Sequence, residues 1–375
     1  MKVLMLSTDK GALKWSGSVF ERIISYGTLC DELVIVVAGG KGEVLKVGQN
    51  VFVYGTKRQN RLSVFFEMIS LGLRMSRQHG FSLGDVVTSQ DPFELGLVAF
   101  CIARFRKLAL HLQVHIDFFS PYYKKESLRQ RSQAWIAEWL LPRADSVRVV
   151  SEKIRTYLIS RGISGTKVAC VPIFTDWKKI QDAPVTYNVK GKYPNAEPLI
   201  LSASRLVKQK NIPLTIEAFS LVQKKYPNAQ LLIVGKGGEQ DRIKALIQAR
   251  NLTDVVHYED WTDDMASYLK TADIFVLSSD YEGWGLSVVE ACAAGCPVVM
   301  TDVGCAGEFL INGENGSVVP VRDVNALTKA LEQLINSQEL REKISSTARA
   351  SVTTLTTHQE YMEAIRQSWV NATHV

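Results

Sequence analysis

Residues 274–301 read IFVLSSDYEGWGLSVVEACAAGCPVVMT, which is the clearest structural pattern in the chain. The apolar, β-branched runs at 274–277 and 298–301 predict two buried strands. Between them, a loop with two glycines leads into a helical stretch that begins near Leu286 or Ser287. A strand, a helix and a second strand in this order indicate a βαβ unit, in which the two strands are parallel.

The same alternation continues in both directions along the chain. Short β-branched runs, separated by longer stretches of helical periodicity, lie at residues 3–7, 33–37, 51–54, 86–89, 108–115, 146–150, 168–171, 199–203, 231–235, 255–257, 274–277, 298–301 and 317–319. Such alternation predicts parallel sheets that are covered by helices on both faces. The predicted fold class is therefore α/β, with Rossmann-like doubly wound sheets.

The length of the chain predicts two domains. A single core stops growing near ~250–300 residues, and this chain has 375 residues. We place the N-terminal domain at residues 1–175 and the C-terminal domain at 176–357, with the weakly periodic segment 172–198 as the linker. The final helix, at about 358–375, is expected to pack back on the first domain through Tyr361, Ile365 and Trp369. Ligands of such folds bind beyond the carboxyl ends of the strands, so we expect the domains to face each other across a cleft.

Composition excludes several classes of protein. The chain is 46% hydrophobic and 22% charged, which suits a globular domain and is too apolar for a disordered one. The longest apolar run, at 95–103, is far short of the ~20 residues that a membrane helix needs. The run at 1–7 is too short for a signal peptide, and the six cysteines are scattered without a CxxC pair, as reduced thiols are. We therefore expect a cytoplasmic protein.

The two halves of the chain differ in charge. Residues 1–175 carry 24 Lys and Arg against 14 Asp and Glu, whereas residues 176–375 carry 20 against 24. A basic half favours an anionic partner. Basic segments at 57–77 and 124–139 are interleaved with apolar residues, as in helices that dock on anionic lipid, although helices packed on a sheet show the same pattern. The hypothesis is peripheral binding to the inner face of the cell membrane. Nucleic acid is not an expected partner, because no recognition motif accompanies the charge.

The loop that precedes the helix at Leu286 carries candidate ligand-binding groups. Its glycines let the backbone approach a ligand closely, and the amides at the helix start suit a phosphate or a sugar oxygen. Glu282 lies in this loop and Glu290 about one turn into the helix, where a carboxylate can accept hydrogen bonds from sugar hydroxyls. The alternative is that Glu290 is a helix-start carboxylate, stabilised by the helix dipole by about 0.3–1 kcal/mol. The two glutamates alone do not decide between these interpretations.

The surroundings of these residues resemble the family-4 retaining glycosyltransferases of the GT-B fold. The resemblance rests on Glu282 and Glu290 in EGWGLSVVEA, on Arg205 and Lys210 in SASRLVKQKN, and on Gly235 in VGKGG. Weaker counterparts in the first half are SQDP at 89–92 and VHID at 114–117. Asn211, which follows Lys210, departs from the family pattern, because glycine is common there.

For the donor side, the resemblance implies a role for each matched residue. Arg205 and Lys210 would bind the donor diphosphate and stabilise the charge of the leaving group, which is electrostatic catalysis without a metal. Glu282 would orient the hexose, and Glu290 would bind the ribose. The remaining donor contacts would come from the turn at Gly235 and from the backbone amides of Gly283, Trp284, Gly285 and Leu286.

For the first domain, the resemblance implies fewer contacts. His115, at the end of a strand, would face the sugar; the alternative is a buried structural histidine, and His111 lies on the same strand. Asp117 would either contact the acceptor or support His115. The first loop, residues 9–18, lacks the family's tandem glycine, and Gly17 is the nearest match for the residue that approaches the donor.

The predicted reaction is retaining transfer of a hexosyl unit from a UDP- or GDP-linked sugar to a hydroxyl of a glycan or lipid-linked acceptor, without a metal or other cofactor. In the mechanism that the family suggests, the acceptor attacks the face from which the diphosphate leaves, and the departing phosphate takes the proton. Two rivals stay open: a GT-B sugar-nucleotide epimerase, and an inactive scaffold subunit that binds a nucleotide sugar. A dehydrogenase is disfavoured, because no GxGxxG follows the first strand.

Overall fold

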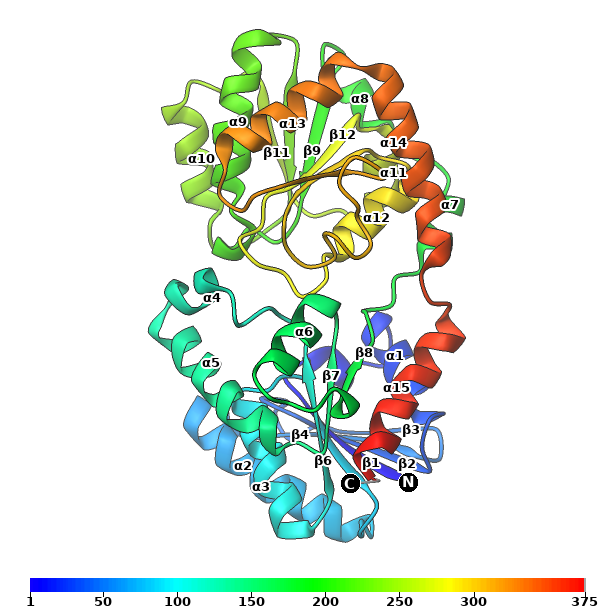
Figure 1. Cartoon of the computed structure of the whole chain (residues 1–375). Coiled ribbons are helices and arrows are strands. Elements are labelled where there is room, and N and C mark those ends of the chain that lie inside the picture. Colours follow the sequence, from blue (N-terminus) through cyan, green and yellow to red (C-terminus); the bar gives the residue numbers. More distant parts are fainter. Residues whose placement is uncertain (374–375) are drawn as a thin grey trace. The chain divides into compact units, whose positions relative to one another are not determined.

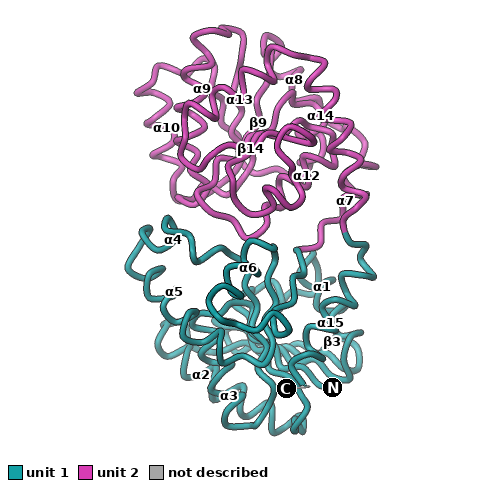
Figure 2. Tube along the Cα trace, in the orientation of Figure 1, with its two compact units in different colours: residues 1–172, 356–375 teal, residues 173–355 magenta. Residues whose placement is uncertain are grey.

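The chain forms two compact units in the computed structural model, which describes residues 1–373 (Figures 1 and 2). Unit 1 contains residues 1–172 and the C-terminal segment from residue 356 onward, and unit 2 contains residues 173–355. Each unit is built on its own sheet. Among residues 1–373, no helix is both long enough and apolar enough to cross a bilayer.

Unit 1 is built on an eight-stranded sheet with the strand order β3-β4-β2-β1-β5-β6-β7-β8. The strands are β1 (Lys2–Ser7), β2 (Glu32–Val37), β3 (Val44–Val47), β4 (Val51–Gly55), β5 (Val86–Ser89), β6 (Ala109–Val114), β7 (Ser146–Val149) and β8 (Val168–Cys170). Neighbouring strands are parallel, except that β3 and β4 form an antiparallel pair. The sequence did not predict β3, because a four-residue edge strand with one buried side chain carries almost no hydrophobic pattern.

Two groups of helices pack on this sheet. The first is α2 (Arg61–Gln78), α3 (Glu94–Arg106) and α5 (Leu128–Leu140), with α3 in contact with both of the others. The second pairs α1 (Ser18–Gly27) with α15 (His358–Thr373), which lies against β6 and β7. The Tyr26 hydroxyl lies 3.0 Å from the Tyr361 hydroxyl, and the Tyr26 ring packs edge-on against the buried Trp369. The apolar face of the last helix thus belongs to the core of unit 1. The shorter helices are α4 (Pro121–Glu126) and α6 (Glu152–Ser160).

Unit 2 is built on a six-stranded parallel sheet with the order β11-β10-β9-β12-β13-β14. Its strands are β9 (Leu199–Ala203), β10 (Gln230–Val234), β11 (Val256–Glu259), β12 (Ile274–Leu277), β13 (Val298–Thr301) and β14 (Ser317–Val319). Its helices are α7 (Trp177–Asp182), α8 (Val189–Lys192), α9 (Ile212–Lys225), α10 (Gln240–Ala249), α11 (Met265–Thr271), α12 (Leu286–Ala294), α13 (Val324–Asn336) and α14 (Gln338–Ser351). Helices α9 and α13 pack on each other and contribute Phe219, Leu327 and Leu331 to the core.

The expected linker at 172–198 is wrong as a description of this segment. Most of it belongs to unit 2, where α7 contacts α12 and α8 contacts α11. The Thr186 backbone amide donates to Ser267 Oγ at 3.0 Å, and Lys190 forms an ion pair with Asp273 at 2.9 Å. The segment lacks periodicity because its helices are only four and six residues long and polar contacts hold them in place.

The strand order of each sheet places a ligand-binding edge. In unit 1 the first strand, β1, lies between β2 and β5, and in unit 2 the first strand, β9, lies between β10 and β12. The chain therefore continues to one side of its first strand and later returns on the other side, which opens a crevice at the carboxyl ends of the strands. The predicted α/β class with doubly wound sheets is confirmed.

Candidate functional site

Three neighbouring loops of unit 2, here called the donor loops, contain most of the predicted site residues. They are residues 204–210 after β9, 235–237 after β10 and 278–286 after β12, and these three strands lie side by side. Parallel strands end at the same edge of a sheet, so the loops share that edge. The loops carry Arg205, Lys210, Gly235, Glu282, Gly283, Trp284 and Gly285, and α12 continues with Leu286 and Glu290.

Glycines bring two of the donor loops into direct backbone contact. A Cβ atom at Gly235 would lie 1.9 Å from the carbonyl oxygen of Ser204, and one at Gly237 would lie 2.2 Å from that of Leu206. The Leu206 amide donates to the Lys236 carbonyl at 2.8 Å, which closes the contact. The predicted turn at Gly235 is therefore required by loop packing, whether or not it also touches a ligand.

Lys210 and Glu282 form an ion pair in the donor loops. Lys210 Nζ lies 2.5 Å from Glu282 Oε1, and the two side chains are only 12% and 8% exposed. Ser279 Oγ also donates to Glu282 Oε1, at 2.7 Å, and Gln209 Nε2 donates to Glu282 Oε2 at 3.2 Å. The sequence analysis assigned separate roles to these two residues, whereas the structure pairs them. Among the residues that the structure describes, Glu282 Oε2 accepts from Gln209 alone, so it retains capacity for a hydroxyl group.

Asp280 anchors the β12 loop to the rest of unit 2. Arg322 donates to both of its carboxylate oxygens, at 3.0 and 2.6 Å, and Asn211 Nδ2 donates to Asp280 Oδ1 at 2.8 Å. Asn211 adopts a left-handed conformation with φ of +44°. Asparagine tolerates this conformation better than most residues, which explains how it replaces the glycine that is common there. The sequence analysis missed the roles of Asn211, Gln209 and Arg322, because their partners lie 69, 73 and 42 residues away along the chain. It also missed Ser279, which bonds Glu282 only three residues on but belongs to no motif.

The β12 loop ends at the N-terminus of α12. Gly285 precedes the helix with φ of +103°, and Cys305 donates its amide to the Trp284 carbonyl at 2.7 Å. A Cβ atom at Gly304 would lie 2.3 Å from that same carbonyl oxygen, so the two loops are in close backbone contact. The amides of a first helical turn have no partner inside the helix. The start of α12 therefore presents amides on a firmly held loop, which suits a phosphate.

Arg205 and Glu290 differ from the paired residues around them. Arg205 is exposed, Glu290 is partly buried, and within residues 1–373 neither side chain has a hydrogen bond or an ion pair. Burial raises the pKa of the Glu290 carboxyl above its usual range. An unpartnered, partly buried carboxylate is costly unless a ligand supplies donors, which favours a binding role over the alternative of a helix-start carboxylate.

His115 directly follows β6 in unit 1 and is connected to a buried polar network. Its Nε2 lies 3.0 Å from Gln113 Oε1, and the same oxygen accepts from Arg148 Nη1 at 3.0 Å. A guanidinium only donates, so the Gln113 oxygen must face it and His115 Nε2 must carry a proton. Burial, with further contributions from Arg148 and Arg22, lowers the pKa of His115 to about 3. His115 is therefore neutral near pH 7, with its Nδ1 as an acceptor.

Asp117 and Gly17 have different local surroundings. Asp117 Oδ1 accepts from the backbone amides of Phe119 and Ser120, both at 3.1 Å, and no hydrogen bond joins it to His115 within residues 1–373. The two predicted roles of Asp117, contact with the acceptor and support of His115, both stay predictions. Gly17 precedes α1 with φ of +98°, and a Cβ atom there would meet no atom within 4 Å. The backbone at Gly17 is thus open to a ligand.

Unit 1 has a pocket of about 450 Å³ at its own ligand-binding edge. It is lined by Lys10 after β1, Gly39 after β2 and Asp91 after β5, together with Arg61 and Glu94. Burial raises the pKa of the Asp91 carboxyl to about 6. Lys10 was missed, because the loop after β1 matches no motif, whereas SQDP at 89–92 was a signal that pointed to Asp91.

Metal-ligating residues do not gather in any part of the chain that the structure describes. No group of three or more His, Cys, Asp or Glu side chains within residues 1–373 is arranged to hold a metal ion. The positive charges of the donor loops are the side chains of Arg205, Lys208, Lys210 and Lys236.

Two family models match successive parts of the chain. The model described as glycosyl transferase 4-like domain matches residues 32–173, and that described as glycosyl transferases group 1 matches residues 186–351. A lipopolysaccharide core biosynthesis glycosyltransferase of Rhizobium meliloti is 31% identical over 152 residues, which are 40% of this chain and 44% of that protein. A poly(ribitol-phosphate) alpha-N-acetylglucosaminyltransferase of Staphylococcus aureus is 30% identical over 203 residues, which are 53% of this chain and 39% of that protein. The matched region thus spans less than half the length of these relatives.

Solved structures extend the likeness over the whole chain. A sucrose-phosphate synthase from Thermosynechococcus elongatus superposes with a TM-score of 0.80 at 21% identity, and covers 98% of both chains. The Anabaena protein HepE, solved in complex with UDP, superposes with a TM-score of 0.73 at 19% identity and covers 98% of both chains. At this identity the likeness shows the fold, and the two family models together match most of the chain. The chain belongs to the family-4 glycosyltransferases of the GT-B fold.

Proposed function

We propose that this chain is a retaining glycosyltransferase that moves a hexosyl unit from a UDP- or GDP-linked sugar to a hydroxyl of a glycan or lipid-linked acceptor, without a metal. The observation that carries the proposal is the contrast inside the donor loops. Lys210 and Glu282 are paired and nearly buried, whereas Arg205 and Glu290 have no partner among residues 1–373. A free cation and a free carboxylate are what a diphosphate and a ribose diol require.

The donor would bind to these groups as follows. Arg205 and the amides at the start of α12 bind the diphosphate, and Glu290 accepts hydrogen bonds from the ribose hydroxyls. Glu282 holds Lys210 Nζ in place at 2.5 Å and keeps Oε2 available for a hexose hydroxyl. The backbone near residues 258–262 is the proposed place for the base. The complex of the Anabaena relative with UDP supports a uridine nucleotide as the first donor to test.

The chemistry would then depend on charge stabilisation. As the bond between the hexose and the diphosphate breaks, negative charge grows on the leaving phosphate, and Arg205 and Lys210 stabilise it. The acceptor hydroxyl attacks the same face and passes its proton to that phosphate, so no basic side chain is required. His115 contributes from unit 1 as a neutral hydrogen-bonding group, the backbone at Gly17 approaches the donor, and Asp117 belongs to the acceptor side.

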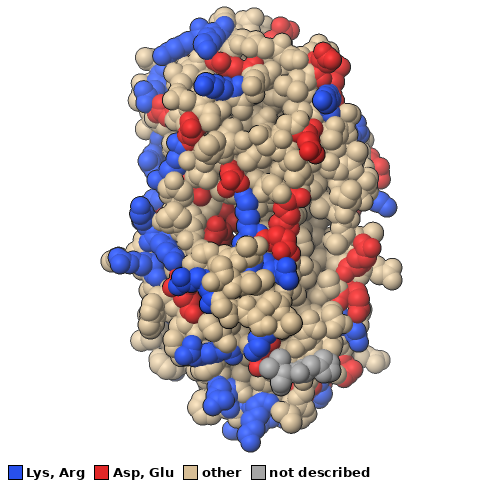
Figure 3. Space-filling view, in the orientation of Figure 1, with Lys and Arg blue, Asp and Glu red and all other residues tan. Residues whose placement is uncertain are grey.

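The acceptor and the place of the reaction are inferred from relatives and from charge. The relatives act, by name, on a lipopolysaccharide core and on poly(ribitol-phosphate), which supports an acceptor of the cell envelope. In Figure 3, Lys and Arg gather over α4 and α5 of unit 1. The same segment exposes Leu128 by 85% and Trp135 by 69%, so we propose that it lies against anionic lipid at the inner face of the membrane. If liposome flotation at low salt shows that the protein does not bind anionic vesicles, this proposal is contradicted.

The donor assignment is tested by thermal unfolding with UDP, GDP, ADP and TDP and with their common sugars. A preferred nucleotide at 100-fold excess over its Kd should stabilise the protein by about 2.7 kcal/mol. Glu290→Ala should lose this stabilisation, whereas Glu314→Ala, which removes an exposed carboxylate outside the donor loops, should keep it. Wild type without a response to any nucleotide would argue against the donor site.

The reaction itself needs separate measurements, which also distinguish the two rivals. NMR of the product should show that the anomeric configuration of the hexose is retained, and an inverted product would overturn the mechanism. A new sugar nucleotide formed from the donor alone would identify an epimerase. A protein that binds the nucleotide tightly but transfers sugar to no glycan or lipid-linked acceptor would be identified as a scaffold subunit.

A further inference from the structure

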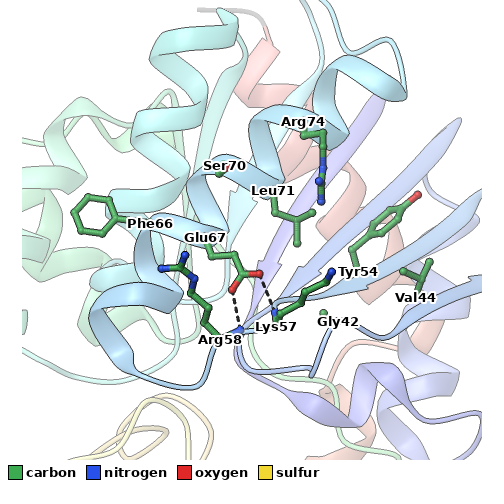
Figure 4. Close-up of a pocket in the computed structure, with 11 residues that line it drawn as sticks. Gly42, Val44, Tyr54, Lys57, Arg58, Phe66, Glu67, Ser70, Leu71 and Arg74 are labelled. Atoms are coloured by element: carbon green, nitrogen blue, oxygen red, sulfur yellow. Dashed lines mark hydrogen bonds between the residues drawn. The ribbon is translucent and has the colours of Figure 1, made fainter.

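Unit 1 has a second pocket, which lies between the β3–β4 hairpin and α2. It has a volume of about 750 Å³, and we call it the Arg74 pocket (Figure 4). Its polar lining comes from Lys57, Arg58, Glu67 and Arg74, and its aromatic lining from Tyr54 and Phe66. None of these residues belongs to the donor loops or to the pocket at Lys10 and Asp91.

The charges of this pocket are unbalanced. Three cations line it against a single carboxylate, that of Glu67, which accepts hydrogen bonds from the backbone amides of Lys57 and Arg58, both at 2.9 Å. Within residues 1–373, the side chains of Lys57, Arg58 and Arg74 make no ion pair and no hydrogen bond. Glu67 therefore fixes the loop after β4 through its backbone and leaves the three positive side chains uncompensated.

The backbone directs Lys57 into the pocket. Gly42 has φ of +77°, and a Cβ atom there would lie 2.8 Å from Lys57 Cγ and 3.2 Å from Lys57 Cε. The alkyl chain of Lys57 therefore runs along the space that a side chain at residue 42 would fill. Figure 4 shows the Lys57 ammonium and the Arg74 guanidinium extending towards the same space from the loop and from α2. Like charges that converge in this way repel each other unless an anion lies between them.

The size and lining of the pocket favour a phosphate ester over a simple anion. A guanidinium and an ammonium together match the several oxygens of a phosphate. The volume far exceeds what a lone anion fills, and the rim is apolar, with Val44 exposed by 65% and Phe66 by 59%. The group that carries the phosphate would contact this rim.

We propose that the Arg74 pocket binds a phosphate ester, with Lys57 and Arg74 on the phosphate oxygens and Arg58 at the edge. The binding itself is independent of the donor loops, because every lining residue lies in unit 1. The role that we assign to the pocket is to hold the acceptor by a phosphate group, and this role rests on the proposed glycosyl transfer. The acceptor would then be an anionic, phosphate-bearing glycan or lipid.

The test compares two arginines of the same helix. Arg74→Gln and Arg77→Gln remove equal charge from exposed positions of α2, but only Arg74 lines the pocket. Binding of sn-glycerol 3-phosphate is measured by calorimetry without any sugar nucleotide. The affinity should fall about tenfold in Arg74→Gln and in Lys57→Gln, and should stay at the wild-type value in Arg77→Gln.

A second measurement identifies the source of the phosphate. Flotation with phosphatidylglycerol vesicles, with phosphatidylcholine vesicles as the control, repeats the comparison of Arg74→Gln with Arg77→Gln. A difference in the soluble measurement supports a free phosphate ester, and a difference with vesicles alone supports a lipid headgroup. If the two variants are equal in both measurements, the pocket is not a phosphate site. A failure of the proposed donor site is distinguishable from a failure of this pocket. In that case UDP would not stabilise the protein, while Arg74→Gln would still bind the phosphate ester more weakly than Arg77→Gln.

Discussion

The donor loops of unit 2 and the Arg74 pocket of unit 1 handle charge in opposite ways. In the donor loops, Lys210 is neutralised by Glu282 and Arg322 by Asp280, and glycines bring the loops into backbone contact. In the Arg74 pocket, Lys57 and Arg74 form no ion pair within residues 1–373, and Glu67 is the one carboxylate against three cations. A site whose charges are mostly paired is preorganised for one ligand, and among residues 1–373 Arg205 and Glu290 are left without partners for it. A site with unpaired cations depends on the ligand for its counter-charge.

The largest expected effect comes from breaking the paired region at Lys210. Lys210→Met leaves the Glu282 carboxylate nearly buried without its cation, so we expect a loss of about 3–5 kcal/mol in the free energy of unfolding, as for other buried pairs. Ser279 and Gln209 still donate to Glu282, which places the loss near the lower value. Urea unfolding of the variant measures it. An exposed ion pair contributes about 0–1 kcal/mol. A loss of less than about 1 kcal/mol would therefore show that Lys210 and Glu282 behave as an exposed pair and not as a buried one.

The next effect concerns the backbone contact between donor loops. A Cβ atom at Gly237 would lie 2.2 Å from the Leu206 carbonyl oxygen, whereas one at the neighbouring Gly238 would meet no atom within 4 Å. Gly237→Ala should therefore destabilise the protein by about 2–3 kcal/mol, because the two loops must separate. Gly238→Ala is the matched control and should change stability by less than about 1 kcal/mol. Equal midpoints in urea for the two variants would contradict close packing of these loops.

A smaller effect tests the open side of the donor loops. Arg205→Gln removes an exposed cation without a partner, so stability should change by no more than about 0.5 kcal/mol. The affinity for UDP should fall about tenfold, because a charged hydrogen bond to the diphosphate is lost. Lys208→Gln, which removes another exposed cation of the same loop, should bind UDP as wild type does. If calorimetry finds that the two variants lose the same affinity for UDP, the loop attracts the nucleotide by its overall positive charge and not by a specific contact with Arg205.

The smallest effect is a pH dependence in unit 1. The pKa of His115 is lowered from 6.5 to about 3, so the unfolded chain binds this proton more readily than the folded chain. The stability contribution is complete above pH 6.5 and is lost as the pH falls towards 3. His115→Gln should make the free energy of unfolding less dependent on pH between pH 5 and pH 7, and His111, whose pKa is also lowered by burial, should keep part of the slope. An unchanged slope would mean that His115 titrates normally.

Much of the fold could be predicted from the sequence, because buried parallel strands have a strong pattern. The runs at 274–277 and 298–301 are β12 and β13 as predicted, and the glycines after β12 do lead into α12. The edge strand β3 and the short helices α7 and α8 escaped prediction. Their few residues are held by neighbours, so no periodicity of their own reveals them.

The candidate site could be predicted only in part. Motif spacing identified Arg205, Lys210, Glu282 and Glu290, and the strand order brings their loops to one edge of the sheet. Spacing could not show that Lys210 and Glu282 are paired while Arg205 and Glu290 are not. Nor could spacing show that Asp117 accepts from the amides of Phe119 and Ser120, because these bonds depend on the local turn.

The sequence by itself determined the fold class and the family, because the period of apolar residues and the spacing of a few glycines and charges are local properties of a chain. Only the tertiary structure decided which charges are neutralised and which are free. Lys210 and Glu282 are 72 residues apart and meet at 2.5 Å, whereas Lys57 and Arg74 in the Arg74 pocket form no ion pair among the residues described. Whether a charge is free depends on distance in space, and electrostatic energy falls with that distance and not with separation along the chain.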